Sequence, residues 1–163
     1  MKTLLLLRHA KSSWKDSDVD DHERPLNKRG KKDAPRMGQL LKDEGLLPDL
    51  ILASSAKRCR KTADHVIHAS GYRGETRITG ELYEAGAAKL RAVIESCDDH
   101  ATRVLLVAHN PGMEELLESL VGAYTPLSTA ALAQVELPID RWADLTSETR
   151  GQLVQTRQPR ELE

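Results

Sequence analysis

The chain has 163 residues, and its 24 basic and 25 acidic side chains give a formal net charge of −1. This length suits one domain, and the balanced charge excludes a global attraction to nucleic acid or to an anionic membrane, so any anion site has to be local. Phe is absent and aromatic residues make up 3% of the chain, so Leu, Val, Ile and Ala have to fill the core.

Cysteine usage and the N-terminal segment indicate a compartment. Cys59 and Cys97 could form at most one bridge, which is not the disulfide framework of a small secreted domain. The apolar run of residues 3–7 is too short for a signal peptide or a membrane span. We therefore expect a cytoplasmic protein with free thiols, organised as one domain of residues 1–157 and a short tail of residues 158–163.

Short apolar runs predict the strands of a buried sheet. Continuous apolar runs suit a sheet that is covered on both faces, because neither side of such a strand meets water. In chain order, the predicted strands are residues 3–7, 49–54, 103–109 and 131–137, followed by a short edge strand at residues 151–156.

Segments with helical spacing separate these strands. They are residues 28–44, 57–70, 87–98 and 112–121. Gly45 is the expected stop of the first helix, whereas Pro35 should either kink that helix or mark its true first turn. Because strands alternate with helices, we predict an α/β fold with three layers, α/β/α, around a mainly parallel central sheet.

Histidines and charged residues follow three of the predicted strands. Arg8 and His9 end the first strand, Arg58 follows the second, His109 ends the third, and Asn110 opens the next helix. Ligands of such folds bind beyond the carboxyl ends of the strands, and a helix N-terminus favours anions. Any one of these residues alone is more often solvated or capping. Their convergence on one rim, in a chain of near-zero net charge, predicts a phosphate pocket.

Several blocks of the sequence resemble a known family. In order, they are LLLLRHAKSSW, ERPLNKRG, SSAKRCRKTA, ELYEAG and VLLVAHNPG. Together they resemble the histidine phosphatase superfamily, whose fold is phosphoglycerate mutase-like, and within it the SixA-type phosphohistidine phosphatases. The resemblance covers roughly residues 3 to 137, and ordered blocks of this kind are more specific than an Arg-His pair alone.

The resemblance implies roles for the residues at the strand ends. His9 matches the family's nucleophile, Arg8 and Arg58 match the arginines that hold the phosphoryl group, and His109 matches the second histidine of the pocket. Ala10 stands where the family more often has glycine. Because Ala adopts a positive φ only at a cost, the turn after His9 has to be right-handed.

The implied reaction has a chemical rationale. A neutral imidazole has a pKa of about 6.5 and is nucleophilic at neutral pH, so His9 would attack phosphorus and form a phosphohistidine that water hydrolyses. Arg8 and Arg58 would stabilise the negative charge of the transition state, and His109, if protonated, would add a third cation. Fixed positive groups can replace the metal ion of other phosphoryl-transfer sites, so we expect no metal and no cofactor.

Three further residues are site candidates. Glu84, in ELYEAG, matches the glutamate that is the general acid of mutase-like members, and it is either that acid or a solvated loop carboxylate. Arg24, in ERPLNKRG, is either a phosphate contact or a salt-bridged loop residue ahead of a helix capped by Asn27. Asn110 is the last candidate for phosphate binding.

Other patterns are weaker. Cys97 and Arg103 have the C-x5-R spacing of cysteine-dependent phosphatases, but the intervening DDHAT carries two aspartates that repel phosphate and no glycine to let backbone N–H groups cradle it. We expect Cys97 on the buried face of its helix. His65 and His68 have no third zinc ligand nearby in the sequence, and His22 is expected at the surface.

Three functions stay open on sequence alone. The first is removal of the phosphoryl group from phosphohistidine in a protein. The second is hydrolysis of a small phosphorylated molecule, or mutase chemistry, on the same fold, although a mutase needs extra loops. The third is a phosphate-binding module without turnover, which would need no nucleophile. We expect a monomer with neither a nucleic-acid nor a membrane partner.

Overall fold

The computed structural model describes residues 1–162, and within them six strands form one sheet in the order β3–β2–β4–β1–β5–β6. The strands are β1 (Lys2–Arg8), β2 (Leu50–Ser54), β3 (Glu75–Thr79), β4 (Arg103–Ala108), β5 (Leu132–Leu137) and β6 (Gln152–Arg157). Strands β3, β2, β4 and β1 pair in parallel, whereas β5 is antiparallel to both of its neighbours. The predicted mainly parallel sheet is confirmed.

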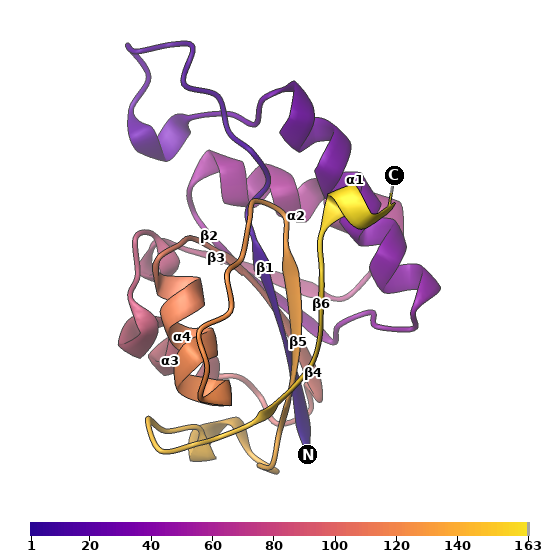
Figure 1. The fold of residues 1–163 in the computed structure, drawn as a ribbon, viewed down its shortest axis with the longest axis vertical. Helices are drawn as coiled ribbons and strands as arrows, with labels where there is room; N and C mark the ends of the chain where they lie inside the picture. Colours follow the sequence, from indigo (N-terminus) through magenta and orange to yellow (C-terminus); the bar gives the residue numbers. More distant parts are fainter. Residues whose placement is uncertain (163) are drawn as a thin grey trace.

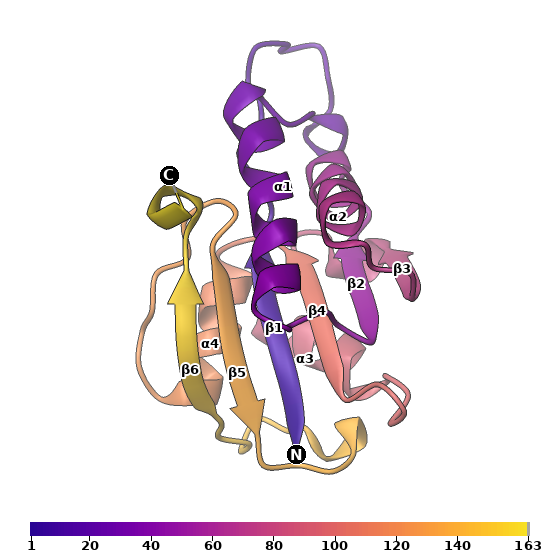
Figure 2. The same cartoon turned by 90° about the vertical axis from the view of Figure 1, so that its right-hand side faces the viewer.

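Helices cover both faces of this sheet (Figures 1 and 2). On one face lie α1 (Lys28–Asp43) and α2 (Lys57–Ser70), and on the other lie α3 (Ala87–Glu95) and α4 (Gly112–Val121). Short 3-10 helices η1 (Asp21–Glu23), η2 (Gly80–Leu82), η3 (Trp142–Asp144) and η4 (Pro159–Leu162) complete the described chain. The predicted three-layer α/β/α architecture is therefore confirmed.

The central strand β1 supplies both cores. Leu5 and Leu7 pack with α1 and α2, whereas Leu4 and Leu6 pack with α3 and α4, and all four side chains are fully buried. Side chains alternate between the faces of a strand, so a strand covered on both faces has to be apolar at every position. Each buried leucine contributes about 1.5–3 kcal/mol of hydrophobic stabilisation, which anchors β1 firmly under the residues that follow it.

Helix α1 begins where the sequence predicts. The Asn27 side chain accepts a hydrogen bond from the Gly30 N–H at 2.9 Å, so the predicted cap is confirmed. The helix continues through Pro35, so the alternative that this proline marks the first turn is wrong. Gly45 follows with a φ of +66°, the left-handed conformation in which glycine commonly ends helices.

Two details differ from the sequence prediction. Strand β3 was not predicted, because it is a sheet edge whose side chains are mostly solvent-exposed, and Ile78 is its one large apolar residue. The predicted helix at residues 87–98 ends at Glu95, so Cys97 lies past the helix end, although it is buried in the core as expected. Both cysteines are free thiols, as predicted.

The segment after β6 packs on the domain. Pro159, in η4, is buried, and Leu162 packs against the core that α1 and α2 form. None of the helices within residues 1–162 combines the length and the apolar character that crossing a membrane requires.

Candidate active site

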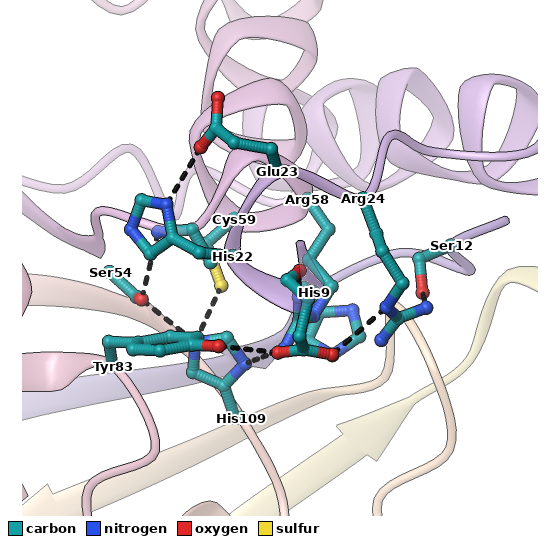
Figure 3. A network of polar contacts seen from close by, with 12 residues as sticks. His9, Ser12, His22, Glu23, Arg24, Ser54, Arg58, Cys59, Tyr83 and His109 are labelled. Carbon is teal, nitrogen blue, oxygen red and sulfur yellow. Dashed lines mark hydrogen bonds and ion pairs between the residues drawn. The ribbon is translucent and has the colours of Figure 1, made fainter. Parts of the chain in front are cut away.

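The residues predicted for the site meet at one end of the sheet, beyond the carboxyl ends of its strands. Strands β2, β4 and β1 are neighbours and run in parallel, so their carboxyl ends lie side by side. His9 follows β1, and its backbone N–H donates to the Ala108 carbonyl at 3.1 Å, which places it beside His109 at the end of β4. The two imidazole centroids are 5.3 Å apart. Arg58, in the first turn of α2, completes this cluster (Figure 3).

A cavity of about 580 Å³ opens over this cluster. Besides Arg8, His9, Arg58 and His109, its lining includes Lys11, Ser12, Trp14, Asp21, Arg24, Glu84, Asn110 and Glu115. All of the site residues predicted from the sequence therefore border one cavity. Its volume is in the range of pockets that take whole small molecules, about 300–1,000 Å³.

The chain between β1 and α1 folds back to bring Arg24 into the cavity. Ser12 and Leu26 form an isolated antiparallel bridge that closes this loop. A Cβ added at Gly30 would lie 2.1 Å from the Lys11 carbonyl oxygen, so only glycine permits the close approach of α1 to the loop. Arg24 is buried there and donates to the Ser12 hydroxyl at 2.7 Å.

His9 has the tautomer and charge state of a nucleophile. Its Nδ1 lies 2.8 Å from the Ala10 carbonyl oxygen, which can only accept, so Nδ1 carries the proton and the Nε2 lone pair is left for attack. Burial, with help from the nearby Arg58, Arg8 and Arg24 charges, lowers the pKa of His9 to about 4. Ala10 does not adopt a positive φ, as predicted.

His109 is neutral in this pocket, so the condition under which it would add a third cation is not met without a ligand. Its Nε2 donates to the Ser54 hydroxyl at 2.8 Å, and its Nδ1 accepts from Arg58 at 3.3 Å. Burial, and then the neighbouring His9 and Arg58, lower the pKa of His109 to about 3. An anion bound beside the ring would favour the protonated form, so His109 is a third cation only if the ligand itself raises its pKa.

The arginines offer donors to an anion. Arg8 is half-buried and uses Nη1 to donate to the Leu127 carbonyl at 3.0 Å. The buried Nε groups of Arg8 and Arg58 have no hydrogen-bond partner within residues 1–162. A buried N–H without a partner costs free energy. Both arginines also line the cavity, where their positive charges favour an anion.

An unpredicted carboxylate lies among these arginines. Asp21 accepts hydrogen bonds from Arg24 Nε at 3.0 Å, from Arg58 Nη2 at 3.1 Å and from the Tyr83 hydroxyl at 2.5 Å. The Tyr83 hydrogen bond, followed by the arginines, lowers the pKa of Asp21 strongly. Burial and the Asp21 carboxylate raise the pKa of Tyr83 to about 12. The three-residue spacing of Asp21 and Arg24 is the only local signal for this ion pair.

Two of the weaker candidates also border the cavity. Glu84 is exposed and has a φ of +53°, a strained conformation for a non-glycine residue and one that recurs at functional sites. The Asn110 amide donates to the Leu127 carbonyl at 2.9 Å and accepts from the Glu114 N–H at 3.2 Å, so it fixes the start of α4. Its role as a phosphate contact stays a prediction.

His22 lies at the surface as predicted, with 37% of its side chain exposed, but it also makes specific contacts. The ring is half-buried, lies 2.8 Å from the Ser55 hydroxyl and packs edge-on against Tyr83 with centroids 4.9 Å apart. Trp14, which the sequence analysis did not single out, stacks on the Arg24 guanidinium at 3.4 Å while 76% of its surface is exposed.

Within residues 1–162, no group of three or more His, Cys, Asp or Glu side chains is arranged to hold a metal ion.

Comparison with known proteins identifies the family. A family model described as histidine phosphatase superfamily (branch 1) matches residues 4–85. An uncharacterized chloroplast protein of Arabidopsis thaliana is 34% identical over 153 residues, which cover 88% of this chain and 70% of that protein. An uncharacterized protein of Mycobacterium leprae is 31% identical over 149 residues and 90% of each chain. The chain therefore belongs to the histidine phosphatase superfamily.

Solved structures narrow this assignment. The candidate phosphohistidine phosphatase SixA from Agrobacterium tumefaciens is 29% identical, with a TM-score of 0.83 over 96% of this chain and 97% of that one. A candidate phosphohistidine phosphatase SixA from Nakamurella multipartitia is 28% identical, with a TM-score of 0.81 over 97% of this chain and 96% of that one. The chain is thus a SixA-type member with the phosphoglycerate mutase-like fold, and it is a phosphatase of the hydrolase class.

Proposed function

We propose that this protein removes the phosphoryl group from phosphohistidine in a protein substrate, without a metal ion, by way of a phosphohistidine formed on His9. The observation that carries the proposal is the neutral His9 ring. Its Nε2 lone pair borders a cavity that Arg8, Arg24 and Arg58 also line. A nucleophile without a charge beside several fixed cations suits attack on a phosphoryl dianion.

The reaction has two steps. In the first, the His9 Nε2 lone pair forms a bond to phosphorus while the bond from phosphorus to the substrate's leaving atom breaks, and that atom takes a proton from solvent or, for an alkoxide, from a general acid. In the second, water attacks phosphorus and the bond to Nε2 breaks, which returns the lone pair to Nε2 of the neutral ring. Both water protons leave with the product as dihydrogen phosphate. Arg8 and Arg58 line the cavity, and their positive charges stabilise the negative charge of both transition states.

The leaving group favours phosphohistidine as the substrate. An imidazole leaves from phosphorus about as readily as the His9 imidazole does, because nucleophile and leaving group are chemically alike. An alkoxide needs a proton from a general acid. Glu84 is the candidate acid at the cavity, and it is exposed on a loop. The SixA resemblance supports the same substrate class.

A small phosphorylated molecule is the second candidate substrate. The cavity of about 580 Å³ has room for a whole small ligand, and Glu84 borders it as a general acid would. This alternative predicts efficient hydrolysis of alkyl phosphates and a strong dependence on the Glu84 carboxyl group.

Trapping of the covalent intermediate tests the proposal. The protein is incubated with a ³²P-labelled phosphohistidine peptide in the presence of a chelator and quenched in alkali. We expect alkali-stable, acid-labile label on His9, no label in His9→Ala, and normal label in the matched control His68→Ala, an exposed histidine on α2. Normal turnover by a folded His9→Ala variant would show that His9 is not the nucleophile.

Substrate preference separates the two candidates. We expect kcat/KM for the phosphohistidine peptide to exceed that for a matched phosphoserine peptide, and Glu84→Gln to slow the phosphoserine reaction more than the phosphohistidine reaction. A higher kcat/KM for small alkyl phosphates, lost in Glu84→Gln, would favour the small-molecule function instead.

A further inference from the structure

Asp21 places a negative charge where the proposed reaction has to bind one. Its side-chain oxygens accept from Arg24, Arg58 and Tyr83, and its backbone carbonyl accepts from Arg58 Nη1 at 2.8 Å. Two arginines of the cavity therefore already direct donors at a carboxylate. A carboxylate and a phosphoryl group present similar oxygen acceptors to guanidinium, so the two compete for the same groups.

In the contact between Asp21 and the two arginines, the carboxylate is the partner that is free to move away. The side chain of Asp21 is 40% exposed, whereas those of Arg24 and Arg58 are 9% and 6% exposed. Asp21 lies in η1, a single 3-10 turn on the loop between β1 and α1, while Arg58 belongs to the packed helix α2. Once released from the arginines, the half-exposed carboxylate would be solvated by water at little cost. The buried guanidinium groups could not be solvated in the same way.

The charges support an exchange. Arg8, Arg24 and Arg58 carry three positive charges around the histidines, which are neutral, and Asp21 cancels one of them. When the carboxylate leaves Arg24 and Arg58, all three positive charges face the entering phosphoryl dianion. The other charged residues of the lining, Lys11, Glu84 and Glu115, are all solvent-exposed, where water screens their charges.

We propose that Asp21 is a specificity-determining residue of this site, a built-in counter-anion that the phosphoryl group displaces from Arg24 and Arg58. The proposal rests on the proposed function in taking the ligand to be a phosphoryl group. Each anion that enters exchanges one set of arginine contacts for another, so charge alone gains little affinity. A substrate gains further contacts through its leaving group, whereas inorganic phosphate does not. Asp21 therefore weakens product binding and speeds product release.

A purely structural role for Asp21 predicts the opposite result. If the carboxylate only holds Arg24 and Arg58 in position, its removal disorders the guanidinium groups and weakens phosphate binding. The direction of the change in affinity thus decides between the two roles, and loss of activity alone would not.

The experiment is calorimetric titration of the full chain with inorganic phosphate. We expect the Kd for phosphate to fall about tenfold in Asp21→Asn, the equivalent of about 1.4 kcal/mol, with a matching fall in the inhibition constant of phosphate during turnover. Asp20→Asn is the matched control, because Asp20 is an exposed acid immediately before Asp21 on the loop. The Kd of this variant for phosphate should equal the wild-type value.

A second variant keeps the test decisive if Asp21→Asn folds poorly. Tyr83→Phe removes one hydrogen bond from the carboxylate and leaves every charge in place. It should tighten phosphate binding by about tenfold, since a hydrogen bond to a charged group is worth about 1.5 kcal/mol or more. An unchanged or weaker affinity in the folded variants overturns the proposal. If folded wild-type protein and both variants bind no phosphate, the cluster is not a phosphate site, and the proposed function falls as well.

Discussion

Replacement of Arg58 tests the electrostatics of the site most directly. Its Nη2 lies between Asp21 at 3.1 Å and His109 at 3.3 Å, and its buried Nε has no partner within residues 1–162. Loss of one preorganised donor to a developing anion costs about 10²–10³ in rate, or about 3–4 kcal/mol. Because Arg58→Ala also removes a full charge, we expect kcat/KM to fall about 10³-fold.

Arg58→Lys divides that effect into charge and geometry. The ammonium keeps the charge but lacks the planar fork, so we expect a loss of about 10–100-fold. The assay is metal-free hydrolysis of an aryl phosphate. Arg60→Ala is the matched control, because Arg60 is two residues further on, outside the cavity, and contacts the Ser55 carbonyl and Glu23. It should keep wild-type activity.

A second measurement checks the reason for the loss. The Arg58 charge lowers the pKa of both His9 and His109, so an NMR titration of the imidazole C–H signals should show both pKa values rising in Arg58→Ala. A folded Arg58→Ala variant with kcat/KM within tenfold of wild type, or with unchanged histidine pKa values, would refute this account of the site.

Two further predictions concern stability. A Cβ at Gly112 would lie 1.9 Å from the Ala85 carbonyl oxygen, so Gly112→Ala should cost about 2–3 kcal/mol and lower Tm by about 4–12 °C. Gly80→Ala, whose nearest atom would be 3.6 Å away, should leave Tm almost unchanged in the same thermal scan, and equal effects would contradict the steric argument. His9 and His109 have folded pKa values of about 4 and 3, below their ordinary value of 6.5. The unfolded chain therefore binds more protons than the folded one between about pH 4 and 6.5, and the free energy of unfolding falls as pH falls through this interval. Urea titrations at pH 7 and 5 should show a smaller loss for His9→Gln than for wild type, whereas equal losses would rule out this contribution of His9.

Local patterns in the sequence predicted most of the fold. The unbroken apolar run of β1 and the apolar spacing of α2 and α4 are visible in the sequence, because each of these segments has to bury its apolar residues whichever elements it packs against. Strand β3 escaped prediction because its pairing with β2 defines it, and its exposed side chains show no pattern. The end of α3 was placed late because the apolar spacing continues through Cys97, which is buried without being helical.

The site residues also fall into those that the sequence predicts and those that only the fold reveals. Arg8, His9 and His109 could be predicted, because the end of a parallel strand is a place that sequence alone locates. Asp21 could not, since it reaches the cavity only when the loop between β1 and α1 folds back on itself. The charge of His109 was also beyond the sequence, because it depends on burial and on the neighbours that the fold supplies.

The sheet order makes the pocket a product of the whole domain. Both partners of β1 lie far from it in the sequence, since β4 begins at Arg103 and β5 at Leu132. A fragment ending at residue 85 would contain His9 and Arg58 and still leave both edges of β1 without hydrogen bonds. Pairings this distant in sequence form slowly, so His9 has no complete site until β4 and β5 have been synthesised and have paired with β1.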